Sequence, residues 1–362
     1  MHRGRVAIYL PSLRGGGAER VAVLLAQGIA QHVQAVDLVL ASAEGPYLNQ
    51  VKPPVRVVNL ESSRVLSSLP RLVRYLRNER PDSMLSLLGH ANVVALLARR
   101  LTQLPHQLVV SEHNPPHLTV RHSPDKRARV VSLLARQLYP SADWVVAVSN
   151  FVAADLQQLY RVPTYKIRII YNPVVVPDSV GDGSLVTSKN SSFLVLGAGR
   201  LVPEKSFETL IRAFGIVCQE RNAQLTILGE GPERSRLEHL VSTLNLQSHV
   251  ALPGFVEDPF SYMRAASVFV LSSRWEGFGN VLVEALACNT PVVATDIPSA
   301  REILEDGKWG ILVPVGDANS MAEAILQTLQ TPPQVDLTER AKAFSLERAV
   351  EAYLDVLGAK PR

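Results

Sequence analysis

The residues best suited to chemistry stand in two stretches of the second half of the chain. The first is a loop that carries Arg200 and Lys205, five residues apart, between a predicted strand over 193–197 and a predicted helix over 207–219. A guanidinium binds phosphate oxygens through two parallel hydrogen bonds, and an ammonium acts as a compact point charge. Together they could stabilise the negative charge of a leaving diphosphate, although on spacing alone two solvated surface cations are the simpler interpretation.

The second stretch holds two carboxylates, Glu276 in a turn and Glu284 in the apolar helix VLVEALA that follows it. We predict that the Asn280 side chain caps this helix, whose free N–H groups and positive dipole end would attract an anion. An isolated pair of acids at this spacing is more often one turn residue and one exposed helix residue. The turn and the helix together nevertheless predict an anion site beside two acids.

Two places in the first half resemble ligand-binding edges of a parallel sheet. The glycines Gly15, Gly16 and Gly17 follow a predicted strand over 6–10 and precede a predicted helix over 18–32, where they would let a phosphate approach the backbone. The pattern is not G-x-G-x-x-G, which argues against a nicotinamide cofactor, and three glycines alone fit a plain turn equally well. His113 follows a strand predicted over 107–111, and a lone histidine there is usually structural.

Length and composition limit the class of protein. The chain has 362 residues, enough for two domains with separate cores, and 47% hydrophobic with 19% charged residues is ordinary for a globular protein. Cys218 and Cys288 lie in apolar helical patterns, which argues against a disulfide framework or a zinc site and fits a reducing cytoplasm. No apolar run reaches about 18 residues, so we expect neither a transmembrane helix nor a signal peptide.

Positive charge is concentrated in the first half. Residues 1–180 carry 21 Lys and Arg against 11 Asp and Glu, whereas residues 181–362 carry 16 against 22, which predicts that the first half faces an anionic surface. A basic helix predicted between residues 65 and 80 has two faces, one with Arg71, Arg74 and Arg77 and the other with Leu72, Val73 and Leu76. A solvated face is the default interpretation, and docking on an anionic membrane with Leu72 and Leu76 inserted is the sharper one. Aromatic residues do not interleave these charges, so nucleic acid is a poor match.

Strand and helix alternate along the whole chain, which predicts an α/β protein with two Rossmann-like, doubly wound parallel-sheet domains. The predicted domains are residues 1–173 and residues 193–335, joined by a linker over 174–192 that is rich in Val, Pro, Gly, Asp and Ser. A last helix is predicted over 337–357, within a terminal segment 336–362.

Three motifs together resemble the family 4 retaining glycosyltransferases. Residues 197–205 match the family's G-x-[GS]-R-x4-K motif, residues 276–296 match its long C-terminal signature, and Gly-Gly-Ala-Glu-Arg at 16–20 matches its N-terminal loop. The chain departs from the signature at Asn289, where the family usually has Gly, and Asn tolerates the left-handed conformation needed there. The resemblance covers nearly the whole chain and implies the GT-B fold, with an active site in the cleft between the two domains and a last helix that crosses back to the first.

The resemblance also implies a role for each residue of the site. The catalytic set would be Arg200 and Lys205 on the donor diphosphate, with Glu276 and His113 on the donor sugar. Glu284 would accept hydrogen bonds from the nucleoside ribose. Backbone or helix-end contacts to the donor would come from Gly16, Gly17, Gly199, Pro253, Gly254, Phe255, Val256, Phe278, Gly279 and Asn280. The donor would be a nucleotide sugar.

The implied reaction moves a hexose or N-acetylhexosamine from a nucleotide sugar, UDP-linked by preference, to a lipid-linked glycan or lipopolysaccharide with retained configuration. No D-x-D motif occurs in the sequence, so we expect no metal and no other cofactor. The basic half predicts work at the inner, cytoplasmic face of the membrane as a peripheral protein. A soluble sugar acceptor and a nucleotide-sugar epimerase are the alternatives. A glycosidase would not need the cation pair, and a scaffold without activity would not keep all four catalytic positions.

Overall fold

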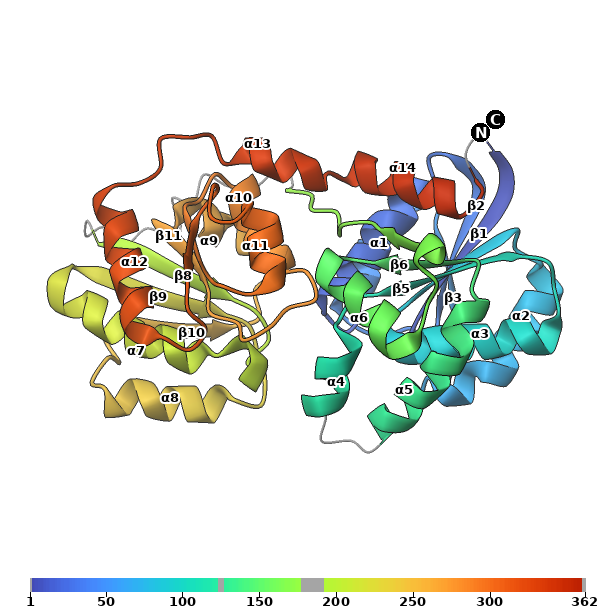
Figure 1. Ribbon diagram of the computed structural model, residues 1–362, viewed down its shortest axis with the longest axis horizontal. Coiled ribbons are helices and arrows are strands. Elements are labelled where there is room, and N and C mark those ends of the chain that lie inside the picture. The colour runs from blue at the N-terminus through green and yellow to red at the C-terminus, as the bar shows by residue number, and fades with distance from the viewer. Residues whose placement is uncertain (1, 123–126, 177–191, 360–362) are drawn as a thin grey trace. The chain divides into compact units, whose positions relative to one another are not determined.

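Apolar runs of strand length, most of them followed by a helix, build two separate parallel sheets in this chain (Figure 1). The structure is a computed structural model that describes residues 2–122, 127–176 and 192–359. Its contacts divide into unit 1, which comprises Met1–Pro173 and Ser345–Arg362, and unit 2, which comprises Val174–Phe344. The prediction of two doubly wound parallel-sheet domains is confirmed. Most of the expected linker, residues 177–191, lies outside the described residues.

Unit 1 is a seven-stranded parallel sheet in the order β3-β2-β1-β4-β5-β6-β7. Its strands are β1 (His2–Leu10), β2 (Val33–Leu40), β3 (Arg56–Asn59), β4 (Ser83–Leu87), β5 (Gln107–Glu112), β6 (Trp144–Ala147) and β7 (Ile167–Ile169). Its helices are α1 (Gly17–Ile29), α2 (Leu69–Glu79), α3 (Gly89–Thr102), α4 (Pro116–His122), α5 (Arg127–Leu138), α6 (Asn150–Tyr160) and α14 (Leu346–Val356). The sequence analysis missed β3, β4, α3, α4 and α5. All five residues of β4 are buried, as expected for a central strand covered on both faces.

Unit 2 is a six-stranded parallel sheet in the order β10-β9-β8-β11-β12-β13. Its strands are β8 (Phe193–Ala198), β9 (Ala223–Leu228), β10 (Val250–Gly254), β11 (Val268–Leu271), β12 (Val292–Thr295) and β13 (Ile311–Val313). Its helices are α7 (Phe207–Glu220), α8 (Arg234–Thr243), α9 (Pro259–Ala265), α10 (Asn280–Ala287), α11 (Pro298–Leu304), α12 (Ala318–Gln330) and α13 (Thr338–Ala341). One core joins the inner faces of β8, β9, β11 and β12 to α7, α8 and α12.

The last helix is not continuous, which corrects the prediction of a single helix over 337–357. Helix α13 passes into a short 3-10 turn over Lys342–Phe344, and α14 begins only after Ser345, whose side chain accepts a hydrogen bond from the Arg348 amide. The break has a physical cause, because Ser345 takes an extended conformation (ψ 155°) as the N-cap of a new helix. The C-terminal helix α14 belongs to unit 1.

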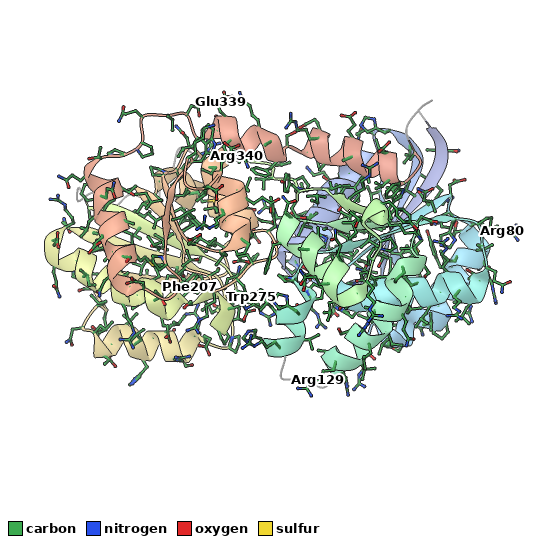
Figure 2. All side chains as sticks on the ribbon, viewed as in Figure 1. Arg80, Arg129, Phe207, Trp275, Glu339 and Arg340 are labelled. Carbon is green, nitrogen blue, oxygen red and sulfur yellow. The ribbon has the colours of Figure 1, made fainter. Side chains whose placement is uncertain are left out.

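The basic helix α2 is oriented by its leucines. Leu72 and Leu76 are fully buried in unit 1, so the prediction that they insert into a lipid layer is wrong. Packing inside unit 1 already removes the apolar surface of both leucines from water, so none is left to insert into lipid. The arginines remain on the exposed side, and Arg80, which ends α2 with a φ of +45°, lies at the outside of unit 1 together with Arg129 of α5 (Figure 2).

Candidate active site

The predicted site residues of unit 2 collect at one edge of its sheet. The strand order reverses between β8 and β11, because β9 and β10 lie on one side of β8 while β12 and β13 lie beyond β11. Ligands of doubly wound sheets bind beyond the carboxyl ends of the strands, at such a switch point. The loop of Arg200 and Lys205 follows β8, and the turn of Glu276 follows β11. The two motifs of the sequence analysis therefore meet where this architecture binds ligands.

The loop after β8 has its conformation because two glycines let backbones approach closely. Gly199 has a φ of +152° and donates its N–H to the Leu228 carbonyl. Gly229 has a φ of +129°, and a Cβ there would stand only 2.0 Å from the Gly199 carbonyl oxygen. Leu201 in turn donates to Glu230. These bonds hold the loop against the end of β9, so the backbone that carries Arg200 and Lys205 is fixed in position.

Lys205 and Glu276 form the central ion pair of this edge. The Lys205 Nζ lies 2.5 Å from Glu276 Oε1, with the two side chains 19% and 13% exposed. The same Oε1 accepts a hydrogen bond of 2.6 Å from the Ser273 hydroxyl. A partly buried pair of this kind holds a cation and a carboxylate ready at one point without desolvating either completely. The pair presents one group suited to phosphate and one suited to sugar hydroxyls.

The two loops are tied together by further bonds that the sequence analysis did not identify. The Ser272 hydroxyl donates to the Lys205 carbonyl at 2.8 Å, and the Arg274 amide donates to the Glu204 carbonyl at 2.7 Å. Thr295, on the next strand, donates to the Ser273 carbonyl at 2.5 Å. Serine and threonine at strand ends give no distinctive sequence signal, so these supporting residues could not be found by pattern.

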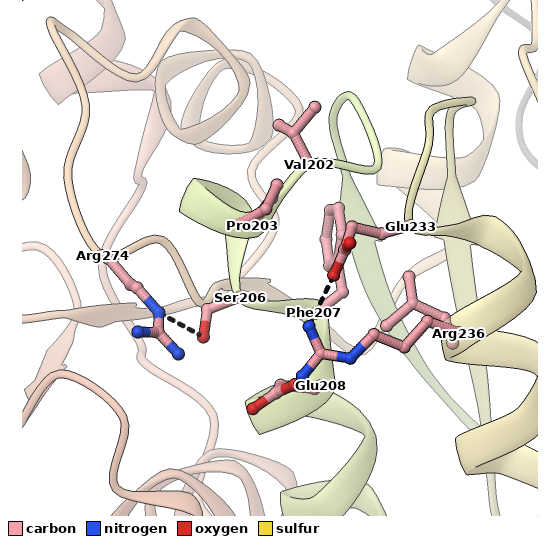
Figure 3. Close-up of a pocket in the computed structure, with 9 residues that line it drawn as sticks. Val202, Pro203, Ser206, Phe207, Glu208, Glu233, Arg236 and Arg274 are labelled. Atoms are coloured by element: carbon pink, nitrogen blue, oxygen red, sulfur yellow. Dashed lines mark hydrogen bonds and ion pairs between the residues drawn. The ribbon is translucent and has the colours of Figure 1, made fainter. Parts of the chain in front are cut away.

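A small pocket of about 190 Å³ lies beside the same loop, at Val202, Pro203 and Ser206 (Figure 3). It is lined by Val202, Pro203, Ser206, Phe207, Glu208, Glu233, Arg236, Leu237 and Arg274. Arg236 pairs with both Glu208 and Glu233, and the Arg274 Nε donates to the Ser206 hydroxyl at 3.4 Å. The charge of Arg236 is thus matched by two carboxylates, and neither Arg200 nor Lys205 lines the pocket. The predicted anion site of Arg200 and Lys205 is therefore separate from this pocket.

Arg200 differs from Lys205 in being exposed, and its guanidinium forms no hydrogen bond or ion pair with the described residues. It is thus available to an incoming anion. Gly254 ends β10 with a φ of +92° and accepts from the Gly229 amide at 2.8 Å, which brings the Pro253–Val256 segment to the same sheet edge. Phe255 is 49% exposed.

The start of α10 corrects one prediction. Gly279, with a φ of +105°, occupies the N-cap position and makes no side-chain cap, while Asn280 is already the first helical residue. A positive φ suits glycine far better than asparagine, which explains the shift by one residue. The Phe278 side chain is buried and packs edge-to-face on Phe344, with ring centroids 5.5 Å apart. Glu284 lies one turn into α10, as predicted, and its side chain is buried.

In unit 1, His113 and the glycine turn also lie at carboxyl strand ends. Gly16 and Gly17 are exposed after β1, and Gly16 is the N-cap of α1. His113 follows β5, is 7% exposed, and its Nε2 lies 3.2 Å from the Ser111 hydroxyl. Its Nδ1 has no hydrogen-bond partner among the described residues. Burial lowers the pKa of His113 to about 4, so the ring is neutral near pH 7.

Beside His113, Glu112 is a buried carboxyl that the sequence analysis mentioned only as part of the strand end. Burial raises the pKa of Glu112 to about 7, although hydrogen bonds from the Tyr139 hydroxyl and from backbone N–H groups oppose the rise. Asn92 donates to the Tyr139 oxygen at 3.0 Å. This buried chain fixes the end of β5 and thus the start of the segment that carries His113.

The geometry defines a class of protein: a two-unit α/β protein with a partly buried lysine–glutamate pair at the switch point of one parallel sheet. Residues 15–176 match the family model "Glycosyltransferase Family 4", and residues 186–344 match "Glycosyl transferases group 1". The chain therefore belongs to the family 4-like glycosyltransferases. The resemblance stated from the motifs is confirmed, and so is the GT-B fold.

Two curated relatives and one solved structure are similar to this chain over nearly its whole length. The chain is 32% identical, over 90% of both chains, to the N-acetylgalactosamine-N,N'-diacetylbacillosaminyl-diphospho-undecaprenol 4-alpha-N-acetylgalactosaminyltransferase of Campylobacter jejuni. It is 28% identical to the lipopolysaccharide core biosynthesis glycosyltransferase LpsE of Rhizobium meliloti, over 96% of this chain and 97% of the relative. HepE of Anabaena, solved with UDP-glucose, has the same fold with a TM-score of 0.83 at 22% identity, covering 99% of this chain and 100% of that one.

Regarding membranes, no helix within residues 2–122, 127–176 and 192–359 combines the length and the apolar character that crossing a bilayer requires.

Proposed function

We propose that this glycosyltransferase moves a hexose or N-acetylhexosamine from a UDP-sugar to a lipid-linked glycan or lipopolysaccharide acceptor, and that it retains the anomeric configuration. The observation that carries the proposal is the Lys205–Glu276 pair at the switch point of unit 2, with Arg200 exposed beside it. The names of the Campylobacter and Rhizobium relatives support a lipid-linked or lipopolysaccharide acceptor, and the UDP-glucose of HepE supports the donor.

In this proposal Lys205 and Arg200 bind the diphosphate and stabilise the charge that develops on it as the bond to the sugar breaks. Glu276 accepts hydrogen bonds from sugar hydroxyls, and Glu284 from the ribose. His113 contacts the sugar. The acceptor oxygen forms the new bond on the side from which UDP leaves, and its proton passes to the leaving phosphate. The cation pair supplies the positive charge that other glycosyltransferases obtain from a metal, so the reaction needs none.

Unit 1 has a surface that suits a membrane-bound acceptor. A shallow groove along α2 is lined by Leu69, Pro70, Val73, Arg74, Arg77, Asn78 and Leu101. Leu101 is 57% exposed, while Arg71 is already engaged by the Leu60 and Glu61 carbonyls. Exposed leucine beside two arginines suits the boundary of an anionic membrane. We propose that the protein works there, at the inner face of the cytoplasmic membrane, as a peripheral protein.

The test is a transfer assay in EDTA. Purified protein is incubated with UDP-glucose, UDP-galactose, UDP-N-acetylglucosamine or UDP-N-acetylgalactosamine, and with a polyprenyl-diphosphate-linked sugar or free sugars as acceptors. We expect transfer to the lipid-linked acceptor at an unchanged rate in EDTA, with an α-linked product by NMR.

Three results would contradict parts of the proposal. Transfer only to free sugars would overturn the acceptor, a β-linked product would overturn retention, and activity that returns only with Mg²⁺ or Mn²⁺ would overturn metal independence. Conversion of the donor to another UDP-sugar without acceptor would instead identify an epimerase.

A further inference from the structure

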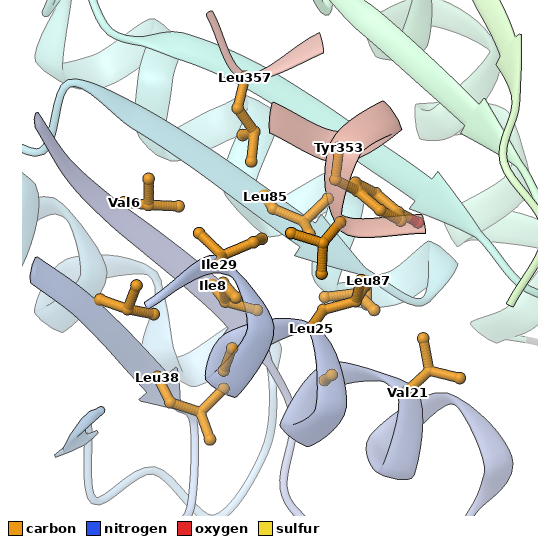
Figure 4. Packing of buried hydrophobic residues seen from close by; sticks show 14 of the residues in the cluster. Val6, Ile8, Val21, Leu25, Ile29, Leu38, Leu85, Leu87, Tyr353 and Leu357 are labelled. Atoms are coloured by element: carbon orange, nitrogen blue, oxygen red, sulfur yellow. The ribbon is translucent and has the colours of Figure 1, made fainter. Parts of the chain in front are cut away.

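The helix α14 is held firmly on unit 1 by packing and by a hydrogen bond. Its apolar side packs on α1 and on the sheet, and Figure 4 shows Tyr353 and Leu357 beside Leu85 and Leu87. A Cβ on Gly28 of α1 would stand 2.5 Å from Val350, so the absence of a side chain there lets the two helices approach. The Gln107 side chain donates to the Val356 carbonyl at 2.6 Å and ties α14 to the start of β5.

Fixed in this way, α14 brings one hydroxyl to the other end of β5. The Tyr353 hydroxyl lies 3.1 Å from the Ser111 Oγ, and that Oγ lies 3.2 Å from His113 Nε2. All three side chains are buried, with exposed fractions of 1%, 0% and 7%. A continuous buried chain of hydrogen bonds therefore runs from the C-terminal helix to the ring of His113.

Which atom donates in each of these hydrogen bonds follows from where the protons are. Burial raises the pKa of Tyr353 to about 12, so its hydroxyl keeps its proton, and within the described residues Ser111 is its recorded partner. A buried hydroxyl proton without an acceptor is costly, so Tyr353 donates to Ser111. The Ser111 hydroxyl then donates its own hydrogen bond to His113 Nε2, which is the acceptor. In a neutral imidazole the other nitrogen, Nδ1, must carry the ring proton.

We propose that Tyr353 and Ser111 are positioning residues that hold His113 as the Nδ1–H tautomer, with Nδ1–H directed as a hydrogen-bond donor toward the substrate. The inference rests on the proposed function, in which His113 contacts the donor sugar. It explains why Nδ1 is buried without a partner among the residues that the structure describes: its partner is a hydroxyl of the bound sugar. It also gives the last helix a part in the reaction beyond packing.

The experiment uses ¹⁵N-labelled full-length protein and compares Y353F and S111A with a matched control, Y9F. Tyr9 is an equally buried tyrosine of unit 1 whose hydroxyl lies 2.6 Å from the Ser68 Oγ, and burial raises the pKa of Tyr9 to about 12 as well. Two-bond ¹H–¹⁵N spectra, with His113 assigned from H113Q, show which ring nitrogen carries the proton. Tm and the turnover of UDP-sugar transfer are measured on the same samples.

We expect wild type and Y9F to show the Nδ1–H pattern, while Y353F and S111A show a mixture of tautomers. All three variants should lose a similar few degrees in Tm, but only Y353F and S111A should lose roughly tenfold in kcat. An Nε2–H pattern in wild type, or unchanged ring signals and kcat in a folded Y353F, would overturn the proposal. The wild-type spectrum decides even if a variant fails to fold. A chain that transfers no sugar would refute the proposed function, while the spectra would still test the hydrogen-bond chain.

Discussion

In the proposed function Lys205 exchanges between two partners: Glu276, with which it forms an ion pair, and the diphosphate of the donor. Glu276 also accepts from Ser273, so it keeps a hydrogen bond when Lys205 turns toward phosphate. Arg200 is exposed and needs no such exchange. In the proposed function the lysine is a charge held near its place by a carboxylate, and the arginine completes the site when the donor binds.

This arrangement predicts the effect of removing either cation. Arg200→Ala and Lys205→Ala should each lower turnover by about 10²-fold, because each removes a preorganised donor to the developing charge. Arg221→Ala is the control: Arg221 is exposed and stands just before β9, at the amino end of the same sheet. Turnover is measured at saturating donor, with folding checked by circular dichroism. Near-normal turnover in the first two variants would refute the phosphate assignment.

Much of this site could be predicted from local sequence, because each cation and acid stands at a fixed offset from a strand. The residues that support it could not. Ser272 and Arg274 contact the loop of Lys205 from almost 70 positions away, and Tyr353 reaches Ser111 from 242 positions away. Such contacts depend on how helices and strands pack in space, which periodicity does not specify.

Among the helices and turns, the end of α10 shows how a departure from the family pattern is accommodated. Asn289 adopts a φ of +58°, and its Oδ1 accepts a hydrogen bond of 2.9 Å from the Leu337 amide just before α13. Asparagine therefore takes the left-handed conformation that the sequence analysis expected. It also ties two segments together, which glycine could not do.

Replacing this residue should separate the two effects. Asn289→Ala should destabilise the protein by about 2 kcal/mol, roughly half from the left-handed backbone and half from the lost hydrogen bond. Asn289→Gly should be within about 1 kcal/mol of wild type, because relief of the backbone offsets the lost bond. Asn245→Ala is a control at a similar φ of +55°, and it should cost about 1 kcal/mol. Urea unfolding measures all three, and equal losses in the two alanine variants would contradict this account.

The sequence analysis located β8 and α7 well, because each has an apolar pattern of the right period over its whole length. It missed β4 because Ser83 and Ser86 interrupt the apolar run, although both serines are buried. It misjudged α2 because periodicity shows that Leu72 and Leu76 share a face but not what that face meets. Packing within unit 1 supplied the answer.

For the molecule as a whole, the uneven charge predicts where it works. The excess of positive charge lies in the sequence of unit 1, and with Leu72 and Leu76 buried, we propose that Arg74, Arg77 and the exposed Leu101 make the membrane contact. Each basic group near an anionic leaflet contributes about 1 kcal/mol, and salt screens the attraction over about 10 Å at 0.1 M. Attachment should therefore be reversible.

Vesicle flotation tests this expectation. The protein should float with vesicles that contain anionic lipid at low salt, detach as salt rises, and bind neutral vesicles poorly. The double variant R74E/R77E should lose flotation, whereas R212E/R221E, with the same change in net charge at exposed arginines of unit 2, should keep it. Equal flotation of both double variants, or no binding by wild type, would leave α2 as an ordinary solvated surface and favour a soluble acceptor.

The claim on which the whole account depends is that Arg200 and Lys205 bind the diphosphate of the donor. Calorimetric titration of the full chain with UDP and with uridine tests it most directly, because the two ligands differ only in the phosphates. UDP should bind about 100-fold more tightly than uridine, since two charge-assisted interactions contribute about 3 kcal/mol together. Lys205→Ala should weaken UDP about tenfold and leave uridine unchanged, while Arg221→Ala should alter neither. Equal affinity for UDP and uridine, or an unchanged UDP affinity in Lys205→Ala, would contradict the claim.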